Sequence, residues 1–143
     1  MSESGRLLGV DHGKVRVGLA VSDPERRLAS PLQTYTRRGK EQDAGFFRTL
    51  VQEEEIVQIV IGLPAHLDGR EGEQARLARA FGKWLENITG LPVVFFDESF
   101  TTYDAEQHLQ AAGLTSKKRK ARRDRVAAQI ILQAFLESAD SSV

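Results

Sequence analysis

Two short apolar runs rich in β-branched residues constrain the fold of this chain most, because each run follows a segment with helical spacing. Residues 56–61 read IVQIVI, and residues 91–96 read LPVVFF. The segments before them, 42–54 and 73–88, carry apolar residues at a period of about 3.6 residues. Strands that alternate with helices in this way form parallel sheets with helices packed on their faces. The pattern therefore predicts an α/β fold.

The N-terminal part of the chain predicts antiparallel strands instead. Residues 7–10 are apolar, residues 15–21 alternate and are rich in β-branched residues, and Gly13 lies between them, so the two runs predict a hairpin. Residues 28–35 predict a third strand, in which Pro31 favours an edge position or a bend. Right-handed crossovers place the fourth and fifth strands beside the first and parallel to it. We therefore expect a five-stranded mixed sheet, opened by an antiparallel meander and flanked by helices on both faces.

The C-terminal part predicts two more helices. Thr101 and Asp104 have the spacing of a capping box, which would open a short helix that ends at Gly113. Residues 126–136 are apolar enough to form a buried last helix. With 143 residues, 41% of them hydrophobic and 28% charged, the chain fits one soluble domain over residues 1–143.

Several classes of protein are excluded or disfavoured by what the sequence lacks. It has no cysteine, which excludes disulfides and thiolate metal sites. No apolar run approaches the roughly 18 residues of a membrane span, and the N-terminus lacks the apolar stretch of a signal peptide. We expect a cytoplasmic protein that does not act in a membrane.

The formal net charge of zero results from a cancellation. Residues 117–125, KKRKARRDR, hold seven basic residues and one acidic residue, so this run carries +6 and the rest of the chain −6. Such a run is either a solvated surface segment or an arm that binds nucleic-acid phosphates. We place it between two predicted helices, so that the fold positions it. The side chains expected to bind nucleic acid are Lys117, Lys118, Arg119, Lys120, Arg122 and Arg123.

Three carboxylates are predicted to meet at one edge of the sheet. Asp11 ends the first strand and Glu98 follows the fifth, and the carboxyl ends of parallel strands meet at a common edge. Asp124 lies in line with Ala128 and Ile131, on the apolar face of the last helix that must meet the sheet. Each residue alone also has a structural explanation: a turn for Asp11, an exposed strand end for Glu98 and a helix N-cap for Asp124.

Converging carboxylates need compensating cations, because they otherwise repel one another. Two Mg²⁺ or Mn²⁺ ions would supply that charge, since both prefer oxygen ligands. Two such ions about 4 Å apart are a known device for cleaving phosphodiesters, in which one activates water and the other stabilises the leaving oxygen. This arrangement predicts a metal-dependent nuclease.

Four motifs follow one another along the chain. They are Gly9-Val-Asp-His-Gly13 with Arg16-Val-Gly18, Ile61-Gly-Leu-Pro64 with Asp68-Gly69, Asp97-Glu98 with Thr101-Thr102, and Asp124 with Ala127-Ala128. Together they resemble the YqgF family, also called RuvX-like, of the RNase H-like superfamily. The resemblance runs from about Leu7 to Leu136 and implies an RNase H-like fold with Asp11, Glu98 and Asp124 as metal ligands. It also implies maturation of the 5′ end of 16S rRNA or, by similarity to RuvC, cleavage of Holliday junctions.

The chain departs from the family pattern at two places. Ser99 stands where the family has Arg, and a short hydroxyl cannot hold a phosphate as a guanidinium does. Near Asp11, Lys14-Val15 replaces the usual Thr-Lys pair. We hypothesise that Lys14 or Arg16 supplies part of the missing positive charge and binds nucleic acid.

Two other functions remain open at this stage. A nucleic-acid-binding ribosome-assembly factor with little or no catalysis is supported by Ser99. An actin- or sugar-kinase-like ATPase also opens with D-x-G, but that architecture needs two such domains around one cleft. The sequence does not separate structured RNA from branched DNA as the substrate, and a homodimer would fit a four-way junction.

Histidines and aromatic residues are predicted to have structural roles. No two of the three histidines share a metal-ligand spacing, and His12 is expected on the surface at a strand end. Four aromatic residues at or near apolar helical positions are expected in the core: Phe46, Phe47, Phe81 and Trp84.

Overall fold

The computed structural model describes residues 5–64, 72–97 and 116–141, and within the last range it describes the side chains of residues 124–138. Every strand and helix predicted within these ranges is present. The predicted helix from Thr101 to Gly113 lies outside them, as do Glu98 and Ser99. The elements are β1 (Arg6–Asp11), β2 (Arg16–Ser22), β3 (Ala29–Thr36), α1 (Lys40–Glu53), β4 (Ile56–Leu63), α2 (Glu73–Thr89), β5 (Val93–Asp97) and α4 (Ser116–Ser141).

The strands form one mixed sheet in the order β3-β2-β1-β4-β5. β1 pairs antiparallel with β2, and β2 pairs antiparallel with β3. β1 pairs parallel with β4, and β4 pairs parallel with β5. The predicted mixed sheet is confirmed, but the expectation that both later strands lie beside β1 is wrong for β5. Since β2 occupies one edge of β1, only one edge remains for a parallel neighbour, and β5 adds to the far side of β4.

The edge position, one of the two alternatives predicted for the third strand, is confirmed. β3 is the first strand of the sheet order and, among the described strands, pairs only with β2. Its register shifts at the proline: Leu19 pairs with Gln33, but the next residue, Ala20, pairs with Pro31. Proline has no N–H to give to a ladder, so a bulge on an edge strand accommodates it at low cost.

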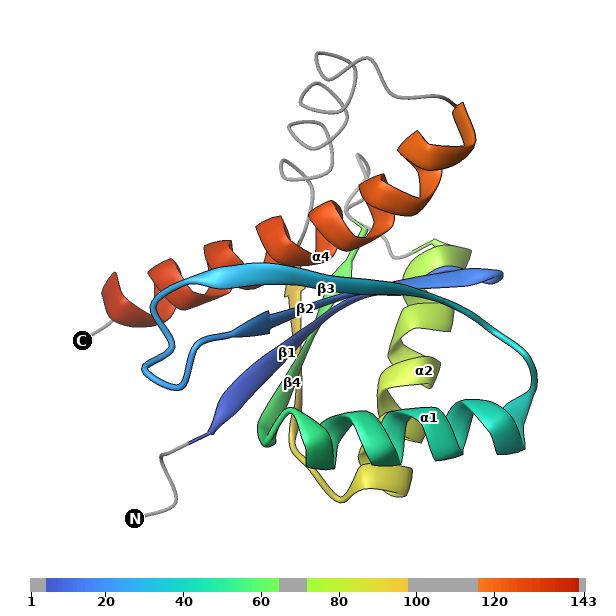
Figure 1. Ribbon diagram of the computed structural model, residues 1–143, viewed down its shortest axis with the longest axis horizontal. Coiled ribbons are helices and arrows are strands. Elements are labelled where there is room, and N and C mark those ends of the chain that lie inside the picture. Colours follow the sequence, from blue (N-terminus) through green and yellow to red (C-terminus); the bar gives the residue numbers. More distant parts are fainter. Residues whose placement is uncertain (1–4, 65–71, 98–115, 142–143) are drawn as a thin grey trace.

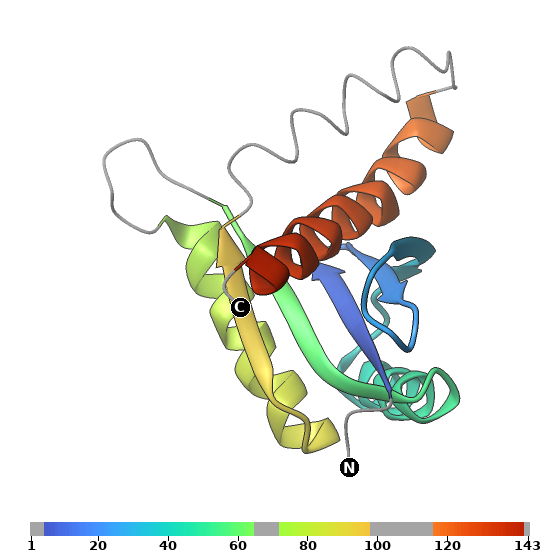
Figure 2. The same cartoon turned by 90° about the vertical axis from the view of Figure 1, so that its left-hand side faces the viewer.

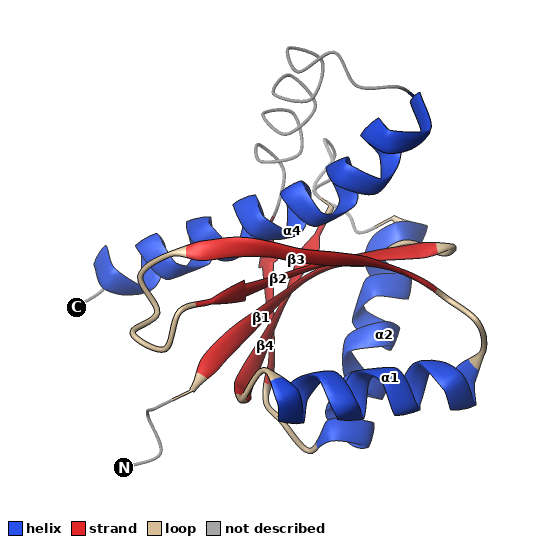
Figure 3. Ribbon diagram, in the orientation of Figure 1, coloured by secondary structure: helices blue, strands red, loops and turns tan. Residues whose placement is uncertain are grey.

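Helices cover both faces of the sheet. α4 lies across one face, and α1 and α2 pack on the other (Figures 1 and 2). Figure 3 shows the strands as a single layer between them. Each face has its own apolar cluster, because successive strand residues point to opposite sides. On β1, Leu8 and Val10 join the cluster with α1 and α2, whereas Leu7 joins the cluster with α4.

The aromatic residues predicted for the core are found there. Phe47 and Phe81 are buried in the cluster under α1 and α2, and Phe46 and Trp84 pack against it, half-buried. α2 ends as the sequence predicts, at Gly90 in the left-handed conformation with φ 72°.

The last helix begins earlier than predicted. The basic run 117–125 was expected between two helices, but it forms the first turns of α4, which begins at Ser116. The prediction is wrong because apolar periodicity appears only from Val126 onward, whereas Lys, Arg and Ala extend a helix without an apolar face. The same finding excludes Asp124 as an N-cap, since it lies well inside the helix. Among the described residues, no helix is long and apolar enough to cross a bilayer.

Candidate active site

Asp11 is the last residue of β1, at the edge of the sheet where the parallel strands end. Alternation along β1 fixes its face. Leu7 packs in the cluster with α4, and the missing side chain of Gly9 faces Leu132 of α4. Asp11 is the next residue of the same parity, so it lies on the α4 face of the sheet, as expected of a site residue.

Two glycines let the backbone of α4 approach the sheet unusually closely. A Cβ on Gly9 would lie 2.8 Å from Leu132 Cβ and 2.9 Å from the carbonyl oxygen of Ala128. A Cβ on Gly18 would lie 1.8 Å from the carbonyl oxygen of Asp124. No side chain fits at either position. The glycines of β1 and β2 therefore allow α4 to pack close to the sheet, and at Gly18 the backbone of Asp124 contacts the sheet.

The strand register then brings the backbones of two of the predicted site residues close to the same glycine. Asp11 pairs directly with Gly18 across the β1–β2 ladder. Residues that face each other in an antiparallel ladder have Cα atoms about 4.5–5.5 Å apart. Since Gly18 also touches the backbone of Asp124, Asp11 and Asp124 lie on either side of one glycine. The predicted inward orientation of Asp124 is also confirmed, because Ala128 and Ile131 in line with it are buried.

Arg16 forms an ion pair with Asp124 and balances its charge. Its Nε lies 3.0 Å from Asp124 Oδ2, and both side chains are partly buried, with 35% and 23% of their surfaces exposed. The sequence predicts Arg16 as a phosphate ligand, and in the structure its Nε pairs with the carboxylate of Asp124, a contact that the sequence did not predict. A pairing across 108 residues has no local signal in the sequence.

The donor set fits a hard divalent cation as far as it is described. Among the residues that the structure describes, no three His, Asp or Glu side chains form a group that could hold a metal ion. The third predicted ligand, Glu98, lies outside those residues, next in sequence to the last residue of β5, Asp97. The two described carboxylates and a third one offer only oxygen atoms, the ligands that Mg²⁺ and Mn²⁺ prefer. In the structure the charge of Asp124 is balanced by its ion pair with Arg16.

His12 is packed rather than free on the surface, which corrects the prediction. Its ring lies 4.7 Å from the ring of Phe81, and its Nε2 lies 3.4 Å from Nη1 of Arg37. Because arginine can only donate, His12 Nε2 accepts and the neutral ring carries its proton on Nδ1. Burial, with a smaller contribution from the Arg37 charge, lowers the pKa of His12 to about 4. His12 is therefore uncharged at neutral pH.

The remaining predicted cations lie at the same edge or at the start of α4. Lys14 is 68% exposed, with its Nζ 3.9 Å from Glu73 Oε2. Apart from Arg125, the basic residues of the run precede Asp124 on the first turns of α4, which extend past the sheet at the upper right of Figure 1. The side chains of Lys117, Lys118, Arg119, Lys120, Arg122 and Arg123 lie outside the described part of the chain.

Two adjoining hollows at this edge were not predicted from the sequence. The first, of about 320 Å³, is lined by Asp11, His12, Lys14 and Leu77 among others. The second, of about 570 Å³, shares the last three of these residues. Its lining also includes Trp84 of α2 and the cations Arg37 and Lys40. The sequence signal that points to it is a second basic cluster, Arg37-Arg38-Gly39-Lys40, which follows β3.

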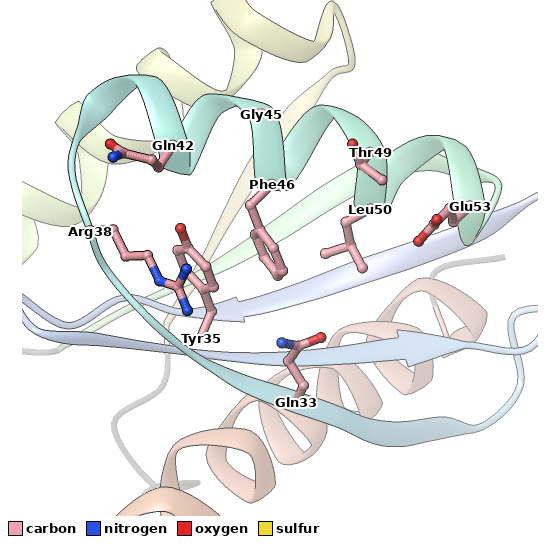
Figure 4. A pocket seen from close by; sticks show the side chains of 9 residues that line it. All are labelled: Gln33, Tyr35, Arg38, Gln42, Gly45, Phe46, Thr49, Leu50 and Glu53. Atoms are coloured by element: carbon pink, nitrogen blue, oxygen red, sulfur yellow. The ribbon is translucent and has the colours of Figure 1, made fainter.

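A third hollow is separate from the carboxylates. It has a volume of about 480 Å³ and lies between β3 and α1, on the face of the sheet opposite α4 (Figure 4). Gln33, Tyr35 and Arg38 line it from the strand side, and Phe46 and Leu50 point into it from α1. It contains no pair of carboxylates.

Comparison with known proteins agrees with the resemblance drawn from the motifs. The family model described as RuvX, Holliday junction resolvase, matches residues 5–138. A protein of Rhodopirellula baltica named "Putative pre-16S rRNA nuclease" is 45% identical over 135 residues, which are 94% of this chain and 78% of that protein. A protein of the same name from Anaeromyxobacter dehalogenans is 42% identical over 132 residues, covering 92% of this chain and 96% of that protein.

Solved structures agree on the fold. RuvC of Thermus thermophilus in complex with a Holliday junction substrate has a TM-score of 0.56 at 14% identity, over 97% of this chain and 98% of RuvC. The fowlpox virus resolvase in complex with Holliday junction DNA has a TM-score of 0.58 at 10% identity, over 94% of this chain and 98% of the resolvase. Such low identities establish the fold alone, which is RNase H-like.

Proposed function

The chain belongs to the RuvX family, and from that premise we propose that it is a metal-dependent nuclease that hydrolyses phosphodiester bonds in nucleic acid. Its substrate is structured RNA, such as the 5′ end of precursor 16S rRNA, or branched DNA of the Holliday-junction type. The names of the family model and of the relatives support both substrates.

One observation carries the proposal: Asp11 and Asp124 flank Gly18 at the carboxyl edge of the sheet. They come from elements far apart in the sequence, and two glycines without room for a side chain keep them together. Carboxylates are costly to gather unless cations are bound there. A structural role alone would be met by the Arg16–Asp124 ion pair and would not require a second carboxylate on the other side of the glycine.

Asp11, Asp124 and Glu98 would hold the divalent ions. When bound, those ions supply a nucleophilic water and stabilise the leaving oxygen. Arg16 positions the carboxylate of Asp124 through its Nε–Oδ2 contact and is near enough to balance charge when the ions are gone. The basic first turns of α4 would hold the phosphates of the flanking duplex or stem.

A substrate panel tests the proposal. Precursor rRNA, single strands, RNA–DNA hybrids and a four-way DNA junction are incubated with the protein and Mn²⁺ or Mg²⁺. We expect the protein to cleave a structured RNA or a branched DNA, and we expect EDTA to stop that cleavage. Asp11→Asn and Asp124→Asn should each abolish it while the far-ultraviolet circular dichroism is unchanged. Glu25→Gln, an exposed acid in the β2–β3 turn, is the control and should cleave as the wild type does.

A second function is favoured by one sequence feature. Ser99 replaces an arginine of the family pattern and weakens the expected hold on phosphate. In this alternative the protein binds nucleic acid during ribosome assembly with little catalysis. Tight binding of precursor rRNA together with no cleavage of any substrate in either metal would favour it. Metal-dependent cleavage that Asp124→Asn removes would exclude it.

A further inference from the structure

The two adjoining hollows form a surface that extends from Asp11 of the candidate active site to a partly exposed aromatic residue. Asp11 lines the first hollow, and His12, Lys14 and Leu77 line both, so the two hollows lie side by side. At the other end Trp84 lines the wall, half-buried on α2. We call this surface the Trp84 groove. Leu77, Phe81 and Trp84 in its lining belong to α2, which packs on the face of the sheet opposite α4 (Figure 2).

Three aromatic rings that line the second hollow, those of His12, Phe81 and Trp84, form a row. The ring centroid of His12 lies 4.7 Å from that of Phe81, and Phe81 lies 5.5 Å from Trp84, both pairs in tilted geometry. Phe81 is buried, whereas His12 and Trp84 are only half-buried and present part of their surfaces to the groove. A planar aromatic group added beside Trp84 would continue this row.

Cations surround the row. The guanidinium carbon of Arg37 lies 5.1 Å from the centroid of Phe81, and the Arg37 Nε lies 3.3 Å from the buried carboxylate of Asp43. That carboxylate fixes the guanidinium in place. Lys14 and Lys40 also line the second hollow, and both are exposed. The described residues that line the second hollow include three cations (Lys14, Arg37 and Lys40) and one carboxylate, Glu73.

These features match the chemistry of a single-stranded nucleic acid. Proteins bind single strands through a positive groove that follows the phosphates and aromatic side chains on which bases stack. The second hollow, at about 570 Å³, lies within the range of roughly 300–1,000 Å³ that is usual for ligand sites. An acidic peptide would satisfy the cations but would leave the aromatic row without a planar partner.

We propose that the Trp84 groove binds an unpaired stretch of the nucleic acid next to the bond that is cut, with a base stacked on Trp84 and phosphates on Lys14, Arg37 and Lys40. The placement beside the scissile bond rests on the proposed nuclease function, because it is Asp11 that connects the groove to the reaction. The groove then selects substrates that carry a single-stranded flank at the cleavage point.

Trp84 is the only tryptophan in the chain, so its fluorescence reports on this groove alone. The protein is titrated in EDTA, where nothing is cut, with oligouridylate in one arm and oligothymidylate in the other. We expect saturable quenching with both, and weak or no quenching with a blunt duplex, whose bases are already stacked. Comparison of the two arms shows whether the groove prefers RNA or DNA.

Charge variants test the role of the cations. Lys14→Gln and Lys40→Gln should each weaken oligonucleotide affinity by roughly three-fold and lower the slope of log affinity against log salt by about 0.7. Lys83→Gln is the matched control, an exposed lysine beside Trp84 in sequence that does not line the groove, and it should change neither quantity. Saturable binding without any quenching, or equal effects of all three variants, would overturn the proposal.

The outcome is separable from that of the nuclease proposal. If the wild type cleaves its substrate but oligonucleotides leave Trp84 unquenched, the groove proposal fails and the nuclease stands. If oligonucleotides quench Trp84 in a lysine-dependent manner but no substrate is cut, the groove binds single strands and the nuclease fails. If both hold, Lys40→Gln should raise KM for substrates with a single-stranded flank and leave kcat unchanged.

Discussion

Gly18 of β2 lies against the backbone of Asp124 so closely that a Cβ would be 1.8 Å from the Asp124 carbonyl oxygen. The contact is backbone against backbone, so no side-chain rotation can relieve it. Gly18→Ala must therefore push α4 away from the sheet at the point where Asp124 meets Asp11. We expect a loss of about 1–3 kcal/mol of unfolding free energy. Metal-dependent cleavage should fall by roughly 100-fold, since a displacement of about 1 Å is enough for that.

Gly45→Ala provides the control for this substitution. Gly45 lies in the middle of α1, and a Cβ added there would have no heavy atom within 4 Å beyond its own helix backbone and chain neighbours. The same exchange there should stabilise the protein by about 0.5–1 kcal/mol, because alanine favours the helix. Urea denaturation and cleavage rates measure both variants. Wild-type stability and rate in Gly18→Ala would show that the glycine contact does not position Asp124.

Arg16 compensates Asp124 when no divalent ion is present. Arg16→Gln should cost about 1 kcal/mol or less in the metal-free protein, since the ion pair is partly exposed. Mn²⁺ should then raise the melting temperature more in the variant than in the wild type, because no guanidinium competes for the carboxylate. Differential scanning calorimetry with and without Mn²⁺ measures this difference.

A second ion pair provides the matched control. Arg6 Nη1 lies 3.2 Å from Glu54 Oε1 at the opposite end of β1, with similar exposure. Arg6→Gln should lose comparable stability while its response to Mn²⁺ stays that of the wild type. An equal Mn²⁺ response in the two variants would mean that Arg16 does not share Asp124 with a metal.

The parts of this site that could be predicted from the sequence are those that depend on residues close together in the chain. Asp11 and the face of Asp124 follow from local rules: a strand end, alternation along β1 and a helical period that aligns Asp124 with Ala128. The same local rules predicted the strands, because the spacing of apolar residues and the ends of each apolar run can be read directly from the sequence.

What the sequence could not provide depends on pairs of distant residues. The ion pair of Arg16 with Asp124 joins β2 to α4, and no sequence pattern near either residue predicts it. The early start of α4 was missed because its first turns have no apolar face. Trp84 has the spacing of a core residue and packs against the core, yet it also borders a groove whose cations come from other elements. A pattern along one helix does not show which side chains of other elements stand opposite.

Tyr35 holds the buried carboxylate that anchors Arg37. Its hydroxyl donates to Asp43 Oδ1 at 2.6 Å, and the backbone N–H of Arg38 donates to the same oxygen at 3.0 Å. Burial by itself raises the pKa of Asp43, but these hydrogen bonds and Arg37 outweigh it, so the pKa lies below its ordinary value of 3.8. The unfolded chain thus takes up the proton first, and stability falls as pH drops below about 4.

Tyr35→Phe removes one donor from that carboxylate. Unfolding free energy at neutral pH should fall by about 1–3 kcal/mol, because a buried acceptor loses a partner. The pKa of Asp43 moves up toward its ordinary value, so the further loss of stability in acid should become smaller. Urea denaturation over a series from neutral to strongly acidic pH measures both effects. A variant with an acid profile as steep as that of the wild type would contradict the role of Tyr35.

The basic first turns of α4 should bind duplex or stem phosphates independently of the Trp84 groove. Replacing Lys117, Lys118 and Arg119 together with glutamine keeps helix propensity nearly constant, so α4 should stay folded. For a four-way DNA junction we expect the slope of log affinity against log salt to fall by about 0.9 for each phosphate that the variant no longer binds. Quenching of Trp84 by oligouridylate should stay as in the wild type. If the triple variant binds the junction and oligouridylate with equally reduced affinity, the two surfaces form one site. If neither affinity falls, the run is a solvated segment and the phosphates bind elsewhere.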